Sequence, residues 1–382
     1  MPIAARTKEL ASRRLVLATL QAIRGCPSQA PARRGTERWG NRAGVIVAAV
    51  VASFAAGPAF ANDTTAELDT GGLVFVQNPD VEMRSEALSI SLTQIDVTYH
   101  FVNTGAQPVT NLVAFPLPDI TVDSPDWNVA VPTDDPVNFV GFTTTANGQP
   151  VTTQVEQKVF ANGIDETALL QQLGIPLAPQ LEATDKALDA LPQDKWQQLI
   201  GLGMAAIDEY GTGPDPKMQQ HLEPRWTLKT TYYWQQSFPP AQDTVIEHRY
   251  KPSVGDSVGT IVGDPQLSSD PDVAKQLAAY KTKYCMDASF LAAAAKAYQK
   301  AQQANGNLGE DRIDYILKTG ANWAAPIADF TLTVDKGDPN NLVSFCANGV
   351  KKLSPTQFQV HYTNFTPTVD LAILILNSGG AP

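Results

Sequence analysis

Cysteine and histidine are scarce in this chain, whose 382 residues include three cysteines and four histidines. None of the histidines lies in the close His, Cys and carboxylate spacings that zinc sites use. We therefore expect neither a metal site nor a cofactor. His248 shares one strand face with Ile246 and Tyr250, which favours a hydrogen-bonded core histidine.

Positive charge is scarce beyond residue 61. The first 61 residues hold nine Lys and Arg but only two Asp and Glu, out of 28 and 39 in the whole chain. Residues 62–382 therefore carry 19 basic and 37 acidic side chains, a net charge near −18. Such an acidic surface repels the phosphates of nucleic acid, so we expect no nucleic-acid partner.

A hydrophobic run long enough to cross a membrane is also missing. The apolar run at residues 43–56 is shorter than the ~18 residues of a membrane span. It follows a basic segment and precedes Ala59-Phe60-Ala61, the order found in secretory signals. We predict that residues 1–61 are a signal peptide with an extended N-terminal lead, cut between Ala61 and Asn62, and that residues 62–382 form a periplasmic or secreted domain without a stable membrane span. The alternative is a short transmembrane anchor.

Strand patterns dominate residues 62–382. Ile95, Val97, Tyr99 and Phe101 alternate with polar residues, which indicates a strand with one face in a core. Similar alternation recurs at residues 225–234, 244–250, 330–334 and 358–362, and the 225–250 segment is predicted to form a hairpin. Short strands separated by Gly, Pro and Asn favour an antiparallel sandwich.

Two helical blocks are predicted between the strands, at about 164–208 and 271–319. The first contains a predicted helix over residues 193–207, and the second a helix over 288–298 with Asp287 as its N-cap. Residues 62–382 are therefore predicted to be mainly β (α+β), with an antiparallel β-sandwich-like core and two inserted helical blocks.

Two cysteines, Cys285 and Cys346, remain after removal of the signal. An even, low number of cysteines in an exported protein predicts one disulfide between them. The alternative is two buried, unpaired cysteines.

Four charged residues, Asp80, Glu82, Arg84 and Glu86, occupy every second position and would share one strand face. Three carboxylates on one face could hold calcium, but the arginine among them favours a solvated, salt-bridged face.

Two short motifs suggest chemistry but lack the required context. Gly255-Asp-Ser-Val-Gly259 matches the G-x-S-x-G nucleophile elbow, yet no helix is predicted after it. Gly201-Leu-Gly-Met-Ala-Ala206 matches a loose dinucleotide-binding pattern, but it follows a predicted helix instead of a strand. We expect neither to be a catalytic or cofactor site.

Large aromatic residues gather in the 225–250 segment, where Trp226, Trp234 and Tyr250 are joined by Tyr233 on the opposite face of the strand. Aromatics on a sheet can form a platform for a glycan or a peptide, and core packing of one face is the alternative. We therefore assign these four residues as the candidate binding site.

The predicted function is non-enzymatic binding of an envelope protein or glycan. The alternative is a hydrolase of envelope polymers that uses a carboxylate pair.

Several long phrases resemble the bacterial secreted family called domain of unknown function 4424. They are NDTTAELDTGGLVFVQNPDVEMRSEALSI (62–90), VNTGAQPVTNLVAFPLPDI (102–120), YYWQQSFPP (232–240), EHRYKPSVG (247–255) and VDKGDPNNLVSFCANGVKKLSPTQF (334–358). The resemblance implies a secreted or periplasmic protein and supplies no catalytic residues.

Overall fold

The computed structural model describes residues 62–70, 72–122, 129–211, 217–267 and 270–377. These residues are 44% strand and 19% helix, which confirms the mainly β, α+β class. The described residues between 62 and 207 and between 222 and 377 belong to one compact unit. Of the second unit the structure describes residues 208–211 and 217–221, where the rings of Tyr210 and His221 stack with centroids 3.9 Å apart. Two short strands, β12 (Ala205–Tyr210) and β13 (Gln219–Pro224), pair in this region.

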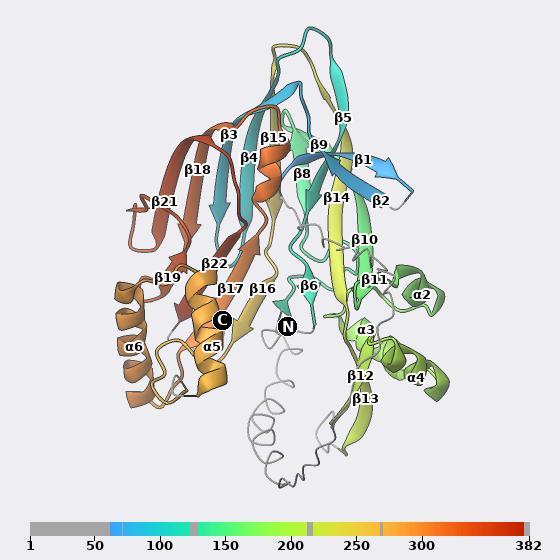
Figure 1. Cartoon of the computed structure of the whole chain (residues 1–382), viewed down its shortest axis with the longest axis vertical. Coiled ribbons are helices and arrows are strands. Elements are labelled where there is room, and N and C mark those ends of the chain that lie inside the picture. Colours follow the sequence, from blue (N-terminus) through green and yellow to red (C-terminus); the bar gives the residue numbers. More distant parts are fainter. Residues whose placement is uncertain (1–61, 71, 123–128, 212–216, 268–269, 378–382) are drawn as a thin grey trace, which may run out of the picture. The chain divides into compact units, whose positions relative to one another are not determined.

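Sheet A has seven strands, and every pairing in it is antiparallel (Figure 1). Its strand order is β11 (Ile164–Asp165), β10 (Gln154–Ala161), β14 (Thr227–Phe238), β5 (Val109–Pro116), β1 (Thr64–Asp69) and β2 (Gly72–Val76), with β6 (Ile120–Thr121) also paired to β14.

Sheet B has eight strands. Its order is β20 (Lys351–Lys352), β21 (Gln357–Phe365), β18 (Ile327–Asp335), β3 (Val81–Ile90), β4 (Ile95–Asn103), β15 (Asp243–Tyr250), β8 (Thr143–Ala146) and β9 (Gln149–Val151). The pairings are antiparallel except that β18 runs parallel to β3.

The inner faces of sheets A and B pack against each other through aromatic rings. Phe115 of β5 and His248 of β15 have ring centroids 4.9 Å apart, and Phe101 of β4 lies 5.8 Å from Phe238 of β14. The three phenylalanines belong to one large buried hydrophobic cluster, and His248 is buried beside them. The arrangement confirms the predicted sandwich-like core, because alternation on each strand supplies one apolar face to the shared interior.

The predicted hairpin over residues 225–250 is wrong. β14 pairs with β10 and β5 in sheet A, whereas β15 pairs with β4 and β8 in sheet B. The segment around Pro239-Pro240 carries the chain from one sheet to the other. Both strands therefore turn their apolar faces toward the same interior, and Trp234 meets His248 there at a centroid distance of 5.4 Å.

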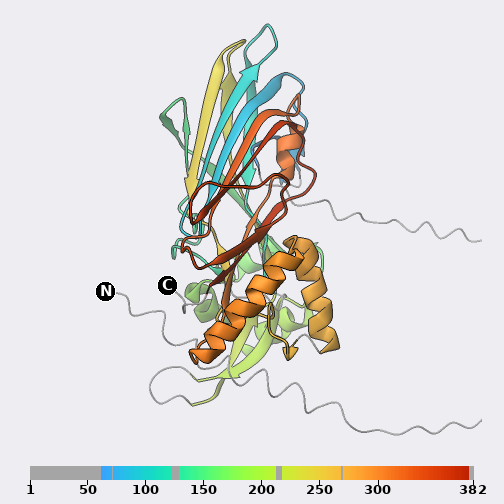
Figure 2. The same cartoon turned by 90° about the vertical axis from the view of Figure 1, so that its left-hand side faces the viewer.

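Sheet C has five strands, in the order β19 (Leu342–Phe345), β22 (Leu371–Asn377), β17 (Gly309–Tyr315), β16 (Val254–Ser257) and β7 (Val129–Ala130). Helices α5 (Pro271–Lys283) and α6 (Ala288–Gln303) lie beside it (Figure 2). They form a second buried cluster together with Leu374 and Leu376 of β22. The Asp287 side chain accepts a hydrogen bond from Phe290 N at 2.7 Å, as predicted for an N-cap.

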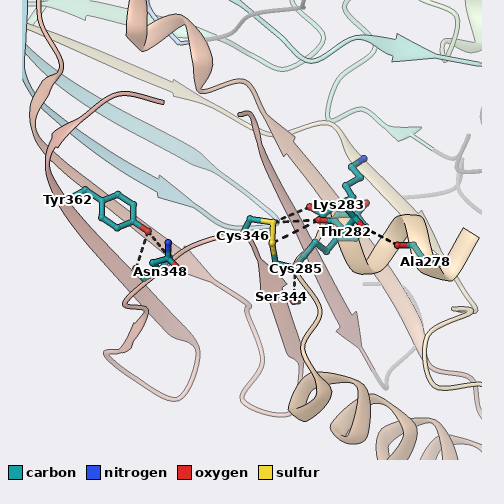
Figure 3. Close-up of a disulfide and its surroundings, with 9 residues drawn as sticks. Ala278, Thr282, Lys283, Cys285, Ser344, Cys346, Asn348 and Tyr362 are labelled. Carbon is teal, nitrogen blue, oxygen red and sulfur yellow. Dashed lines mark hydrogen bonds between the residues drawn. A yellow bond between two sulfur atoms is a disulfide. The ribbon is translucent and has the colours of Figure 1, made fainter. Parts of the chain in front are cut away.

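The disulfide between Cys285 and Cys346 is present (Figure 3). Cys285 follows the end of α5 and Cys346 follows β19, so the bond ties this helix to sheet C. The pairing encloses a sequence separation of 61 residues.

Both predicted helical blocks contain helices, but each ends earlier than expected. The first holds α2 (Thr167–Gln172), α3 (Glu182–Asp189) and α4 (Gln193–Gly201), and β12 replaces the predicted continuation to residue 207. Gly203 has φ of +72° and donates its N–H to Ile200 O, which closes α4. In the second block α6 stops at Gln303, and β17 and the short 3₁₀ helix η2 (Lys318–Asn322) follow. None of the described helices is long and apolar enough to cross a membrane.

Candidate functional site

Three of the four predicted binding residues lie in the core. Trp226, Trp234 and Tyr250 are 1%, 4% and 4% exposed. Trp226 Nε1 donates to Leu177 O at 2.9 Å, and burial raises the pKa of Tyr250. A partner could reach these rings only if the core opened, so their contribution is to folding.

Tyr233 lies on the opposite, outer face of sheet A and is half-buried. Its register partners are Gln154 of β10 and Ala114 of β5. The ribbon of β1 and β2 bends toward β10, because Leu73 N donates to Glu156 Oε1 at 3.1 Å. Gly72, at the start of β2, has φ of +112°, a backbone conformation that favours glycine.

The two motif segments have ordinary structural roles. Ser257 ends β16, and its hydroxyl donates to Gly259 O at 2.7 Å. β16 is antiparallel to both of its neighbours, so the strand-turn-helix geometry of a nucleophile elbow does not form. Gly201 and Gly203 lie at the end of α4, not at a helix N-terminus facing a phosphate.

A pocket of about 290 Å³ opens beside α6. Its lining residues are Gly259, Thr260, Ile261, Asp264, Leu267, Tyr298, Gln302, Asn307 and Leu308. This lining contains one carboxylate, Asp264, which accepts a hydrogen bond from the Tyr298 hydroxyl at 2.7 Å. The pocket therefore does not provide the pair of carboxylates that the hydrolase alternative needs.

A group of charged side chains in sheet C, here called the sheet C cluster, consists of Asp256, Glu310, Asp311 and Arg312. Arg312 forms an ion pair with Glu310, and Thr260 Oγ1 donates to Glu310 Oε2 at 2.5 Å. Asp256 and Asp311 lie opposite each other on β16 and β17. Desolvation raises the pKa of both aspartates, and Arg312 opposes the shift.

A second group, here called the sandwich cluster, lies in the interior between sheets A and B. Its members are Asn62, Asp63, Glu86, Tyr99, His248, Tyr315, Thr319 and Trp323. All are buried. Because ionisable groups are rarely buried without a partner, a cluster of this kind is a candidate functional site.

The ion pair in this cluster joins Asp63 and His248. Their Oδ1 and Nε2 atoms are 2.9 Å apart, and both side chains are fully buried. Burial raises the pKa of Asp63, and the charge and hydrogen bond of His248 oppose that rise. Four aromatic rings surround the imidazole, those of Tyr99, Phe115, Phe142 and Trp234, with centroid distances from 4.9 to 5.6 Å. The predicted hydrogen-bonded core histidine at position 248 is confirmed.

Glu86 is also buried, so the predicted solvated face of charged residues is wrong for this residue. The pairing of β3 with β4 shifts between Met83 and Ser85, which marks a β-bulge at Arg84. Before the bulge Val81 and Met83 point inward, and after it Glu86, Leu88 and Ile90 do. Burial raises the pKa of Glu86 to about 8, although a hydrogen bond from Asn62 Nδ2 at 2.9 Å lowers it.

Asn62 connects most of the cluster. Its Oδ1 accepts from the Tyr99 hydroxyl at 2.5 Å and from Asp63 N at 3.0 Å, while its backbone N–H donates to Thr319 Oγ1. Trp323 Nε1 donates to Asp63 O at 2.7 Å. The first described residues of the chain are therefore held inside the sandwich.

Among the described residues, three buried atoms of the sandwich cluster have no hydrogen-bond partner: Asp63 Oδ2, Glu86 Oε1 and His248 Nδ1. Unpaired carboxylate oxygens at full burial can accept from a cation or another donor. Within the part of the chain that the structure describes, no group of three or more His, Cys, Asp or Glu is arranged to hold a metal ion.

Sequence reasoning found His248 through its apolar face-mates but missed Asn62, Asp63 and Glu86 as partners. Asp63 and His248 are 185 residues apart, and no local pattern indicates their contact. The one signal of the bulge that turns Glu86 inward is that the apolar positions change from odd, at Val81 and Met83, to even, at Leu88 and Ile90.

No curated protein matches this chain. Among solved structures, the crystal structure of a "putative nutrient binding protein" from Legionella pneumophila is similar, with 16% identity and a TM-score of 0.39 over 83% of this chain and 70% of that chain. A similarity at that TM-score assigns neither fold nor function. The family model for the domain of unknown function DUF4424 matches residues 61–374. This match confirms the resemblance found in the sequence, and the chain belongs to the DUF4424 family.

Proposed function

We propose that this protein is exported to the periplasm, loses residues 1–61, and acts there without catalysis by binding an envelope protein or glycan. Export is supported by the basic and apolar segments before residue 61 and by the disulfide. The predicted cut also falls directly before Asn62, Asp63 and Thr64, which are fully buried. A boundary between a removed segment and a folded domain is expected at such a point, and the family match begins at residue 61.

The proposed contact surface is the outer face of sheet A around Tyr233. The observation that carries it is the division of the aromatic group: three rings are buried in the core, and Tyr233 alone among the four faces outward. Tyrosine offers a flat apolar ring and a polar hydroxyl, a combination common at protein and glycan contacts. The nearby ribbon of β1 and β2 adds the exposed apolar side chains of Leu68 and Val74.

Capture from an envelope extract tests this proposal. The exported protein is crosslinked in the extract, and its partners are compared with those of Tyr233→Ala and of Leu353→Ala. Leu353 is an exposed apolar residue next to β20 in sheet B and serves as the matched control. Loss of a captured protein, or of sedimentation with purified envelope glycan, in Tyr233→Ala alone is expected. Equal capture by all three proteins would contradict the location, and N-terminal sequencing that finds residues 1–61 still attached would contradict export.

The hydrolase alternative has one observation in its favour, the opposed and desolvated pair of Asp256 and Asp311 in the sheet C cluster. Raised carboxyl pKa values are typical of catalytic acids. The same pair lies beside the Arg312 guanidinium, and Asn377 Nδ2 donates to Asp311 Oδ2 at 2.7 Å, which supports a structural role. Degradation of an envelope polymer that is lost in Asp256→Asn would overturn the non-catalytic proposal.

A further inference from the structure

The sandwich cluster has an imbalance of buried charge. Asp63 and Glu86 supply two carboxyl groups, and the imidazole of His248 is the cation-forming group that contacts either of them. Within the described residues, neither carboxylate pairs with a lysine or an arginine. Buried charges normally occur in balanced, hydrogen-bonded sets, so one further cation would be expected here.

The count of hydrogen-bond donors points to where that cation would arise. As a peptide nitrogen, Asn62 N carries one hydrogen, which it donates to Thr319 Oγ1. Asp63 Oδ2 and Glu86 Oε1 remain without donors. Both carboxyl groups are adjacent to Asn62, since Asp63 is the next residue and Glu86 accepts a hydrogen bond from the Asn62 side chain.

We propose that the sandwich cluster is a buried acceptor site for the free α-amino group of Asn62. Hydrolysis of the peptide bond after Ala61 consumes one water molecule and leaves a carboxylate on Ala61 and an ammonium group on Asn62. The ammonium has three hydrogens: one keeps the bond to Thr319, and two become available for the unpaired oxygens of Asp63 and Glu86. The proposal rests on cleavage at this bond and is independent of the binding role of Tyr233.

The surroundings of Asn62 are already arranged to hold this terminus. Its side-chain amide is fixed by Glu86 and Tyr99, and a Cβ added at Gly320 would lie 2.6 Å from Asn62 Nδ2. Gly320 therefore leaves just enough room for the asparagine side chain. Trp323 anchors the next peptide through Asp63 O. A fixed side chain places the main-chain nitrogen with little further loss of conformational entropy.

Cleavage would then complete the charge balance of the core. The titratable groups that face the terminus are Asp63 before β1, Glu86 on β3, Tyr99 on β4, His248 on β15 and Tyr315 on β17. With the ammonium present as a second cation-forming group beside the His248 imidazole, each of the two buried carboxyl groups has a partner. A chain that keeps Ala61 lacks the second cation and must keep Glu86 protonated or bury its charge unpaired.

Two purified proteins with defined N-termini test the site. One begins at Asn62 and the other at Ala61, each released by a protease that leaves no extra residue. Labelling of the α-amine with an N-hydroxysuccinimide ester is followed by mass spectrometry, together with thermal melting. We expect the Asn62 amine to react at least about tenfold more slowly than the Ala61 amine, because each unit rise in the pKa of an amine lowers its neutral fraction tenfold. The protein that begins at Asn62 is also expected to melt at the higher temperature.

Matched substitutions distinguish an ion pair between the Asn62 ammonium and Glu86 from burial of the Asn62 amine alone. Glu86→Gln keeps the shape of the side chain, which can still accept a hydrogen bond from Asn62 Nδ2. It is therefore expected to speed labelling of the Asn62 amine. It is also expected to narrow the difference in melting temperature between the proteins that begin at Asn62 and at Ala61. Glu82→Gln, on the same strand and in an exposed pair with Arg84, is expected to leave both unchanged. Equal labelling rates and melting temperatures for the Asn62 and Ala61 termini would overturn the proposal. N-terminal sequencing of the exported protein at another residue would instead refute the cleavage position.

Discussion

The sandwich cluster and the sheet C cluster both bury more carboxylates than cations, and they compensate for the excess differently. In sheet C the cation is the Arg312 guanidinium, which pairs with Glu310, while Thr260 and Tyr280 donate to the same carboxylate. In the sandwich, within the part of the chain that the structure describes, the Asp63 carboxylate is paired with the His248 imidazole and the Glu86 carboxylate with the Asn62 amide. Because several groups donate to Glu310, the sheet C cluster should tolerate the loss of one donor. The sandwich cluster has few donors, so it should be sensitive to such a loss.

The two clusters also differ in how they assemble. Asp256, Glu310 and Arg312 come from two adjacent strands, β16 and β17. Asp63 and His248 are 185 residues apart, so their pair forms only after sheets A and B have closed on each other. Loss of a partner in the sandwich should therefore affect the whole domain, whereas a change near sheet C should have a smaller effect.

The largest effect is expected from Trp234→Ala, beside the sandwich cluster. Trp234 is 4% exposed and packs on His248, so removing its ring leaves a cavity at the centre of the sandwich. The free energy of unfolding in urea should fall by about 3–5 kcal/mol. Tyr233→Ala, one residue away on the outer face, should cost less than about 1 kcal/mol. Similar losses for the two variants would contradict the assignment of inner and outer faces.

A smaller but still large loss is expected from His248→Ala, which removes the partner of Asp63. A buried pair that loses one member costs roughly 3–5 kcal/mol, and protonation of Asp63 should keep the loss at the lower end of that range. The comparison is His361→Ala, because His361 pairs with Asp329 at 2.9 Å with both side chains about half exposed. That variant should cost at most about 1 kcal/mol. Equal losses in urea denaturation would show that burial does not distinguish the two pairs.

Some of the structure around the sandwich cluster was predictable from the sequence. Alternation of apolar residues predicted the strand at 95–102, and β4 covers Ile95–Asn103. It also placed His248 on a core face, because its neighbours at every second position are apolar. These predictions succeed because the period of two is a local property of the chain.

Other features depend on contacts between distant segments, which one sequence does not reveal. The bulge at Arg84 reverses the side of Glu86 without a glycine or proline to mark it. The segment around Pro239-Pro240 is short enough for a hairpin, yet β14 pairs with β10 and β5 in sheet A while β15 pairs with β4 and β8 in sheet B. The pairing of Asp63 with His248 needs the complete fold.

In the sheet C region, loss of the disulfide should have a moderate effect. Replacing Cys285 and Cys346 with serine frees a loop of 61 residues, for which loop entropy gives roughly 4 kcal/mol. Cys285 has φ of +51° just after the end of α5, where Met286 N donates to Lys281 O, so this helix end is also held without the bond. We therefore expect a loss of about 2–3 kcal/mol in urea denaturation. An unchanged unfolding midpoint would mean that α5 stays docked to sheet C without the bond.

The smallest effect, and the sharpest test of the sandwich cluster, is the pH dependence that Glu86 imposes on a chain that keeps Ala61. With its pKa raised to about 8, Glu86 keeps its proton in the folded state up to about pH 8, whereas the unfolded state loses it near the ordinary pKa of 4.5. Between these values the folded state binds more protons, so the free energy of unfolding must fall as pH rises, by at most about 1.4 kcal/mol per pH unit. Glu86→Gln should reduce that slope between pH 6 and pH 7, while Glu82→Gln, which is paired with Arg84 at the surface, should keep it. Urea denaturation at the two pH values measures the slopes, and identical slopes in Glu86→Gln and the unchanged chain would mean that the Glu86 carboxyl is charged in the folded sandwich.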